Sequence, residues 1–263
     1  MKDFKVQLAS KFDDKRLKFP CLVSPKLDGI RAVFYKGKFY SRNQKVIVGM
    51  SHLIKDLRNF ELTGVSLDGE LMVPGLTFQV SSGKIRNYQE TPDAVFNVFD
   101  IPSMDMSQKA RIDQLYLYAE RLESTHVKLV EHFLVHTHEE INKLYKVFRE
   151  EGYEGAMVKN LHAPYENKRS RDWMKLKEVE TYDVLCTGFF RGKGRLSDTL
   201  GGIIVELDGV PIRVGGGFSD ADRDHIWRNK DYYRGMVCEV ATQELTPSGS
   251  MRHPRLIRWR IDL

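Results

Sequence analysis

Residues 19–43 read FPCLVSPKLDGIRAVFYKGKFYSRN, and this stretch sets the local fold around it. The runs at 30–35 and 38–42 are rich in apolar and aromatic residues and flank Lys36-Gly37. This pattern predicts a β-hairpin, because glycine accepts the left-handed backbone that a two-residue turn requires. We therefore expect two antiparallel strands, at 30–35 and 38–42.

The segment just before this hairpin holds the first candidate for chemistry, Lys26-Leu-Asp28-Gly29-Ile-Arg31. A lysine amine becomes nucleophilic when nearby cations or partial burial lower its pKa. Gly29 allows a ligand to approach the backbone closely, and Arg31 is able to grip a phosphate or carboxylate with two donors. The same pattern occurs by chance on surface turns in about one chain in a hundred, so it needs support from other motifs.

The rest of the first two thirds of the chain predicts mixed strands and helices. Apolar runs at 65–73 and 94–100 favour strands. Two helices are predicted from apolar residues at helical spacing, the second with Thr137 as its cap and Glu140 three residues later. Those apolar residues are Ile112, Leu115, Tyr116, Ala119 and Leu122 in the first helix, and Ile141, Leu144, Tyr145 and Phe148 in the second.

The last third changes character and predicts a small barrel. Asp208-Gly209 between two of its apolar runs is typical of a hairpin turn, and 219–229 favours one short helix. Five strands with one helix suggest an OB-type barrel, which is a common nucleic-acid platform. We expect domains at 1–179 and 180–263. The five runs lie at 183–190, 202–207, 210–214, 236–243 and 255–261.

Composition narrows the class of partner. The 263-residue chain has a net charge of +5, and its cations cluster at 168–177, 191–195 and 251–261. Three such clusters favour a phosphate backbone as partner. The sequence has no apolar run of about 18 residues, so we expect no membrane partner. Three widely spaced cysteines and a polar start predict a cytoplasmic protein.

Several other features have ordinary explanations when each is taken alone. Residues 188–193 (GFFRGK) superficially resemble a phosphate-binding loop, but the spacing is one residue short and no Ser or Thr follows the lysine. His132, His136 and His138 lie close together without a fourth ligand, which argues against zinc. Isolated Phe and Met residues are most often part of a core, and isolated Glu residues are most often solvated.

Six motifs in a fixed order favour a functional explanation over these ordinary ones. The lysine segment is followed by SLDGELMV (66–73), FNVFDI (96–101), EGYEGAMVKN (151–160) and RDWMKLK (171–177), and the tail reads HPRLIRWRIDL (253–263). This ordered set resembles the covalent nucleotidyltransferase superfamily and, within it, ATP-dependent DNA ligases of the minimal viral type. The resemblance implies an α+β fold: a nucleotidyltransferase domain with antiparallel sheets and helices, followed by a C-terminal OB-fold β-barrel.

The resemblance implies a role for each matching residue in adenylylation. Lys26 would attack the α-phosphorus of ATP and become lysyl-AMP. Lys175 and Lys177 would grip the α-phosphate, and two positions apart on a strand they share one face. Arg31 would contact the ribose or the nick phosphate, and Asp28 would have a supporting role.

The same resemblance extends to the base, the ribose and the metal. Phe99 would stack on the adenine, with Met157 on the opposite face. Glu70 would bind a ribose hydroxyl. Glu154, together with Asp68, would hold Mg²⁺, with Mn²⁺ as a substitute ion.

The expected partner is nicked double-stranded DNA, bound by a monomer. Arg42 resembles the arginine that contacts the 5′-phosphate of the nick, with Arg31 beside it. Lys193 and Arg195 are candidate DNA contacts in the barrel. Since little chain lies outside the two domains, we expect these domains to grip the nick by themselves.

The tail resembles the family's last motif, which contacts pyrophosphate. Arg255 and Arg258 fit this motif, with Arg260 as a further candidate. The family usually continues with Asp-Lys, whereas here Asp262 is followed by Leu263. That difference leaves open how loading of ATP is completed.

Two alternatives remain at this level. An RNA ligase or an mRNA-capping guanylyltransferase would use the same lysine motif. A nucleic-acid binder with an OB-type barrel and a degenerate partner domain would form no covalent nucleotide adduct. The FDI, EGAMVK and WMKLK segments favour the DNA ligase hypothesis.

Overall fold

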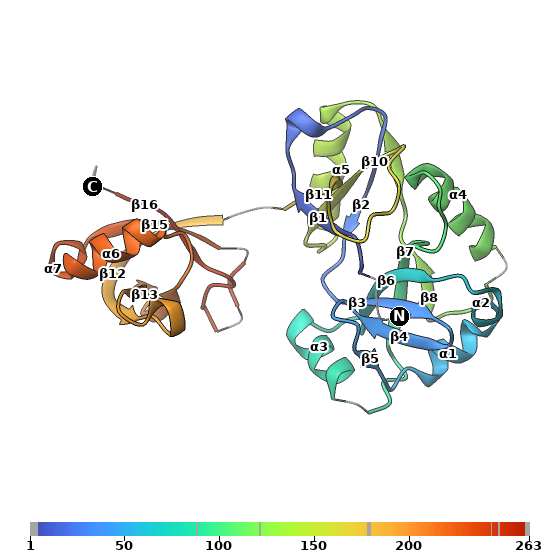
Figure 1. Cartoon of the computed structure of the whole chain (residues 1–263), viewed down its shortest axis with the longest axis horizontal. Helices are drawn as coiled ribbons and strands as arrows, with labels where there is room; N and C mark the ends of the chain where they lie inside the picture. The colour runs from blue at the N-terminus through green and yellow to red at the C-terminus, as the bar shows by residue number, and fades with distance from the viewer. Residues whose placement is uncertain are drawn as a thin grey trace. The chain divides into compact units, whose positions relative to one another are not determined.

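The computed structural model of the chain describes residues 5–87, 89–120, 122–177, 180–242, 244–246 and 248–260. Two compact units are present, Met1–Lys177 and Glu178–Leu263 (Figure 1). Each unit has its own sheet structure and its own apolar core. The expectation about Asp262 and Leu263 lies outside the described residues.

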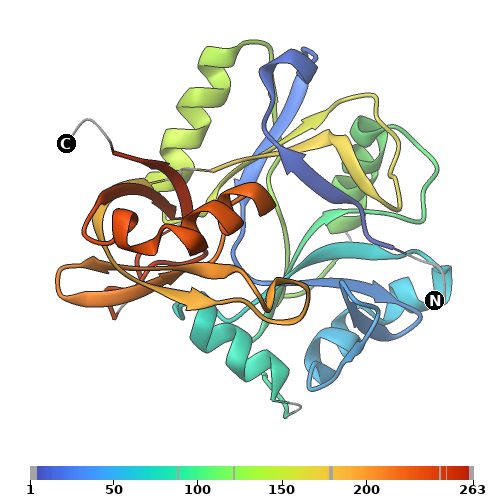
Figure 2. The ribbon, with the colours of Figure 1, turned by 60° about the vertical axis from the view of Figure 1, so that its left-hand side comes forward.

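One sheet of the first unit brings together three of the motif segments. It has five strands in the order β1-β11-β10-β2-β9. β1 and β11 come from opposite ends of this unit and lie side by side (Figure 2). The pairings of β10 with β2 and β11 are antiparallel, so the lysine segment and two later motifs become neighbours. The strands are β1 (Leu8–Lys11), β2 (Cys21–Lys26), β9 (Phe133–Val135), β10 (Gly155–Asn160) and β11 (Arg169–Leu176).

The second sheet of this unit has six strands in the order β5-β4-β3-β6-β7-β8. The predicted hairpin is confirmed, with Lys36 at φ 46° and Gly37 at φ 70° in its turn. Both residues have the left-handed backbone that such a turn requires. The strands are β3 (Ile30–Tyr35), β4 (Lys38–Ser41), β5 (Val46–Ile47), β6 (Leu67–Met72), β7 (Val95–Asp100) and β8 (Val127–Leu129).

Both helices predicted from apolar spacing in the first unit are present, as α4 and α5. Thr137 and Glu140 form the predicted capping box at the start of α5. Ile141 and Phe148 of α5 are buried in an apolar cluster with residues of β2 and β10, which fixes the sheet beneath the helix. The helices are α1 (Ser51–Asp56), α2 (Arg58–Thr63), α3 (Phe78–Arg86), α4 (Gln108–Ala119) and α5 (His138–Glu150), with a 3-10 turn η1 (Asp14–Arg16).

The second unit contains the five predicted strands in one antiparallel sheet, ordered β14-β13-β12-β15-β16. An isolated parallel bridge joins Gly216, just after β14, to Arg255 of β16, and the Leu256 N–H donates to the Gly216 carbonyl at 2.9 Å. The two edges of the sheet therefore curl toward each other, as the OB fold requires. The strands are β12 (Glu180–Arg191), β13 (Leu200–Leu207), β14 (Val210–Val214), β15 (Val237–Thr242) and β16 (Arg255–Trp259).

The predicted helix between the third and fourth strands of this unit is also confirmed. It is α6 (Asp220–Arg228), capped by Ser219 and followed by the short α7 (Lys230–Tyr233). Ile226 of α6 packs into the apolar core formed by the strands. A 3-10 turn, η2 (Gly194–Leu196), lies between β12 and β13. Within the described residues, no helix has the length and apolar character needed to cross a membrane.

Candidate nucleotide site

A cavity of about 250 Å³ in the first unit gathers most of the residues singled out from the sequence. Its wall contains charged, aromatic and thioether side chains from both sheets. The mixture suits a ligand with a flat apolar part and an anionic part. The predicted site residues in this wall are Lys26, Arg31, Arg42, Glu70, Phe99, Met157 and Lys175, joined by Leu8, Ala9, Val130, Lys159, Arg169 and Trp173 among others.

The candidate nucleophile is held by a carboxylate. Lys26 ends β2, and its ammonium donates a hydrogen bond to Glu154, whose other carboxylate oxygen accepts one from Lys177 at 3.0 Å. Burial acts to raise the pKa of Glu154, but the two lysines outweigh burial and lower that pKa overall. Glu154 is therefore an anion that pairs with two cations, of which Lys26 lines the cavity.

Local backbone geometry explains why a glycine follows this carboxylate. Gly155 begins β10 at φ 151° and pairs with Lys26 across the sheet. A Cβ at this position would lie 2.3 Å from the Leu176 carbonyl oxygen, so any larger residue would push β10 and β11 apart. The glycine therefore allows Glu154, Lys26 and the end of β11 to meet.

Lys175 lies on the cavity side of β11, where it pairs with Met157 of β10. Burial lowers its pKa, and the charges of Lys177 and Lys26 lower it further. Three lysines thus converge near one carboxylate. Such an excess of positive charge suits a phosphate.

The Arg31 guanidinium is held in place by Asp68. Its guanidinium makes two hydrogen bonds to Asp68, at 2.6 and 2.5 Å, and lies 4.7 Å from the centroid of the Phe99 ring. Burial acts to lower the pKa of Arg31, but Asp68 outweighs burial and raises that pKa overall. Asp68 is fully buried, so water does not compete for its carboxylate, and the two hydrogen bonds hold Arg31 in place as a cation.

Glu70 pairs with Arg31 across β3 and β6 and lines the same cavity. Burial raises the pKa of Glu70 to about 7, although Arg31 and Lys26 pull it down in part. A carboxyl group near its midpoint at neutral pH is able to donate or accept a hydrogen bond. Either capacity suits a ligand hydroxyl.

Phe99 and Met157 form the apolar part of the wall. Phe99 lies near the end of β7, where the Trp173 ring meets it edge-on at a centroid distance of 6.1 Å. Met157 lies on β10 and also lines the cavity. An aromatic ring and a thioether are suited to enclosing a purine.

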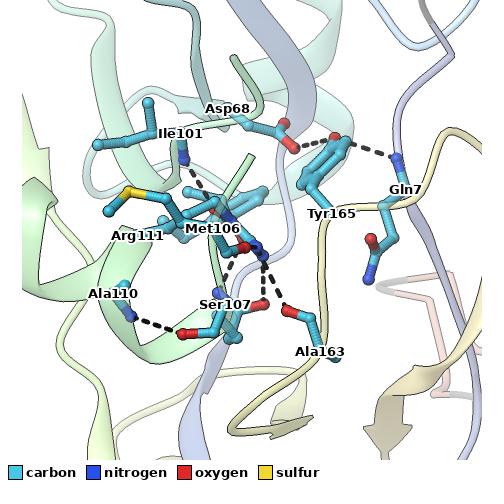
Figure 3. A network of polar contacts seen from close by, with 12 residues as sticks. Gln7, Asp68, Ile101, Met106, Ser107, Ala110, Arg111, Ala163 and Tyr165 are labelled. Carbon is cyan, nitrogen blue, oxygen red and sulfur yellow. Dashed lines mark hydrogen bonds and ion pairs between the residues drawn. The ribbon is translucent and has the colours of Figure 1, made fainter. Parts of the chain in front are cut away.

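Asp68 and Asp28 are placed differently from the residues in the wall. Asp68 is fully buried, and its oxygens accept hydrogen bonds from Arg31. Asp68 also accepts a hydrogen bond from the Tyr165 hydroxyl (Figure 3). In this arrangement Asp68 serves Arg31, and its predicted role as a metal ligand gains no geometric support. Asp28 lies on the loop between β2 and β3, close enough for its charge to act on Glu70.

The donor set fits Mg²⁺ only in part. Glu154 offers carboxylate oxygens of the kind that Mg²⁺ binds beside substrate phosphates. No cluster of three or more His, Cys, Asp or Glu side chains that could hold a metal occurs among the residues the structure describes.

A second cavity of about 580 Å³ shares Arg31, Arg42 and Glu70 with the first. Arg42 is exposed in the turn after β4, so it faces both spaces. Lys45 and Arg86 add further positive charge to this wall. The second cavity is therefore a cationic extension of the first.

The candidates in the second unit are on its surface. Lys193 is exposed, Arg195 forms an ion pair with Asp220 at 2.7 Å, and Arg255 is exposed on β16. Arg258 and Arg260 are paired with Glu239 and Asp183. Their predicted roles stay predictions.

Sequence reasoning missed Lys159, Trp173 and Tyr165. Lys159 and Trp173 line the first cavity, and burial lowers the pKa of Lys159 to about 8. Lys159 could have been found, because it follows Met157 by two positions on the same strand and therefore shares its face. Tyr165 lies on the segment between β10 and β11, where no periodicity marks it.

Known proteins confirm the class that this fold and site define, a nucleotidyltransferase domain followed by an OB-fold domain. The profile of the ATP dependent DNA ligase domain matches residues 6–177, and that of the DNA ligase OB-like domain matches residues 191–260. The chain belongs to the ATP-dependent DNA ligase family.

Individual relatives agree with this assignment. The DNA ligase of Enterobacteria phage T3 is 27% identical over 89% of this chain and 88% of its own length. The DNA ligase of African swine fever virus is 29% identical over 65% of this chain, a match that spans only 45% of the viral protein. A solved Lig E DNA ligase, described as binding DNA with a minimal scaffold, has a TM-score of 0.85 at 24% identity and covers 97% of this chain and 99% of its own.

Proposed function

We propose that this protein seals nicks in duplex DNA with ATP, through a lysyl-AMP and a 5′-adenylylated DNA intermediate. The contact between Lys26 and Glu154 carries the proposal. It joins an amine that lines a cavity of about 250 Å³ to a carboxylate that also binds Lys177, and Lys175 lines the same cavity. Phosphoryl transfer depends mainly on positioning and charge neutralisation, and this site supplies both.

In the first step, the neutral amine of Lys26 attacks the α-phosphorus of ATP. This amine forms when the Lys26 ammonium gives up one proton to solvent. As the P–N bond forms, the bond to the bridging oxygen breaks, pyrophosphate leaves with that electron pair, and the attacking nitrogen releases a second proton to solvent. Lys175 and Lys177 stabilise the charge on the α-phosphate. Phe99 and Met157 hold the adenine, and Glu70 binds the ribose.

Mg²⁺, held by Glu154 and the nucleotide phosphates, would supply further neutralisation of charge. Mn²⁺ is a chemically reasonable substitute. Because Glu154 pairs with Lys26, its binding to an ion would free the lysine side chain. In this proposal, the Glu154 carboxylate binds Lys26 first and the ion afterwards.

In the second and third steps, AMP moves from Lys26 to the 5′-phosphate of the nick, and the 3′-hydroxyl then attacks that phosphate with release of AMP. Arg42 and the cations of the adjoining cavity suit the nick phosphates. We propose that the protein acts as a monomer in the cytoplasm, with Lys193, Arg195 and Arg255 as contacts to DNA or pyrophosphate.

The test is a sealing assay with ATP and Mg²⁺ on nicked DNA–DNA duplexes, on RNA–DNA hybrids and on nicked RNA. We expect sealed DNA and a labelled protein–AMP adduct, both absent in Lys26→Ala. Lys109→Ala is the matched control, because Lys109 pairs on the surface with Asp113 at 2.6 Å. An adduct that forms with GTP alone would favour a capping enzyme, and sealing of RNA alone would favour an RNA ligase. An adduct that survives Lys26→Ala would show that Lys26 is not the nucleophile.

A further inference from the structure

A closed ring of hydrogen bonds lies behind Arg31. The Tyr165 hydroxyl donates to Asp68 at 2.7 Å and accepts from the Gln7 backbone N–H at 3.0 Å. The same carboxylate oxygen of Asp68 binds Arg31, and the Gln7 carbonyl accepts from that guanidinium at 3.2 Å. Arg31, Asp68, Tyr165 and Gln7 thus bind one another in a circle, of which Figure 3 shows the Gln7–Tyr165–Asp68 part.

Three segments far apart in the chain meet in this ring. Gln7 immediately precedes β1, whose residues Leu8 and Ala9 line the cavity. Asp68 belongs to β6, and Tyr165 belongs to the segment between β10 and β11. Gln7 and Asp68 are fully buried, so neither has water to replace a lost partner. The hydroxyl of Tyr165 therefore satisfies two buried polar groups at once.

The ring of Tyr165 is held by separate contacts. It meets the Trp173 ring edge-on at 5.7 Å, and the Arg111 guanidinium lies 5.6 Å from its centroid. Arg111 is itself fixed by an ion pair with Asp100. It also donates hydrogen bonds to the carbonyls of Met106 and Ala163 (Figure 3). The aromatic ring would therefore keep its place if only the hydroxyl were removed.

We propose that Tyr165 is a positioning residue, which acts through Asp68 to hold the Arg31 guanidinium over Phe99 at the wall of the nucleotide cavity. The inference rests on the proposed function, in which Arg31 contacts the nucleotide or the nick phosphate. Burial raises the pKa of the Tyr165 phenol well above 10, and the Asp68 charge adds to this effect. The hydroxyl keeps its proton at physiological pH and remains a donor to Asp68.

Tyr165→Phe removes the hydroxyl and keeps the ring. We expect a roughly tenfold slower formation of lysyl-AMP at saturating ATP, the size that follows from losing one hydrogen bond to a charged group. The rate is measured below the melting transition, so that a fold-stability effect alone would leave it unchanged. Tyr116→Phe is the control, because the Tyr116 hydroxyl binds the His132 backbone N–H outside this ring.

A double-mutant cycle with Arg31→Gln separates positioning from structure. If Tyr165 acts through Arg31, the double variant is as slow as Arg31→Gln alone. The proposal would be overturned if the rate loss of the double variant were the product of the two single losses. It would also be overturned if the adenylylation rate of Tyr165→Phe lay within twofold of wild type.

A measurement independent of activity completes the test. The measurement is hydrogen exchange of the Arg31 Nε–H with water in ¹⁵N spectra, where the Arg31→Lys variant identifies the signal. We expect slow exchange in the unmodified protein and faster exchange in Tyr165→Phe. Rapid exchange in the unmodified protein would overturn the inference even if the variant failed to fold. Slow exchange in a protein without ligase activity would reject the proposed function and support the ring.

Discussion

Lys26 and Glu154 lie 128 positions apart in the chain, and the Lys26 ammonium donates a hydrogen bond directly to the Glu154 carboxylate. The strands bring the two residues close together, because Gly155, next to Glu154, pairs with Lys26 across β10 and β2. The same carboxylate binds Lys177. A single anion therefore sets the positions of two lysines that have separate roles in the proposed chemistry.

Replacing Glu154 by Gln should slow adenylylation strongly. The amide keeps the shape of the side chain but removes the charge that offsets Lys26 and Lys177, so we expect a loss of roughly a hundredfold, as for other preorganised charges in active sites. Formation of labelled lysyl-AMP measures the change. Glu151→Gln, an exposed neighbour, is the control; equal rates in the two variants would contradict the role of Glu154.

Glu70 should make stability depend on pH. Its pKa is raised from 4.5 to about 7 by burial, so the folded state favours the protonated form. This contribution to stability is complete below pH 4.5 and is lost as pH rises through 7. Glu70→Gln should therefore be more stable than wild type at pH 8, by roughly 1–3 kcal/mol, with a smaller difference at pH 5. Urea unfolding at both values measures this, and a difference independent of pH would refute it.

The buried pair of Arg111 and Asp100 should be essential for folding of the first unit. Both side chains are fully buried, and the guanidinium binds the carboxylate at 2.7 Å. Arg111→Met leaves an uncompensated buried charge, so we expect a loss of about 3–5 kcal/mol in the free energy of unfolding. Lys109→Ala removes an exposed pair instead and should cost under about 1 kcal/mol. Similar losses in the two variants would show that burial of the pair is not decisive.

Phe99→Leu should weaken ATP binding more than it slows chemistry. Leucine preserves apolar volume but removes the aromatic face, so we expect the KM for ATP to rise roughly tenfold while the rate at saturation changes little. Phe60→Leu is the control, since Phe60 packs against Tyr118 away from the cavity. A variant with unchanged KM would place the adenine elsewhere.

Binding to nicked duplex should weaken steeply as salt rises. The two cavities share Arg31 and Arg42, and Lys45 and Arg86 extend the cationic wall. Each phosphate contact releases counterions, so the logarithm of the binding constant should fall linearly with the logarithm of salt concentration. Arg86→Ala should reduce that slope by about one. Fluorescence anisotropy with labelled DNA gives the slope, and a slope near zero would exclude this wall as a phosphate contact.

Local patterns in the sequence predicted several elements of the fold. Lys36-Gly37 and Asp208-Gly209 have the backbone freedom of hairpin turns, and both hairpins form. Thr137 with Glu140 predicts the start of α5, and the capping box is present. These features depend on neighbours within a few positions, so no long-range information is needed to recognise them.

The sequence also predicted the residues of the candidate site, but it did not predict which side chains they bind. Lys26, Glu70, Phe99 and Met157 line one cavity, as their motifs suggest. The motif order gave no sign that Asp68 would be fully buried and bound to Arg31. Tyr165 carries no pattern at all, and only the meeting of three distant segments reveals its contacts.

The sequence by itself determined the hairpin turns, the helix caps and the apolar runs of several strands and helices, because these depend on backbone preference and on contacts between near neighbours. Only the tertiary structure decided which charges share a partner and how deeply each is buried. Solvation and Coulomb energies depend on distances between atoms from remote segments, and those distances are set when the sheets pack, as for Lys26 with Glu154 and Arg31 with Asp68.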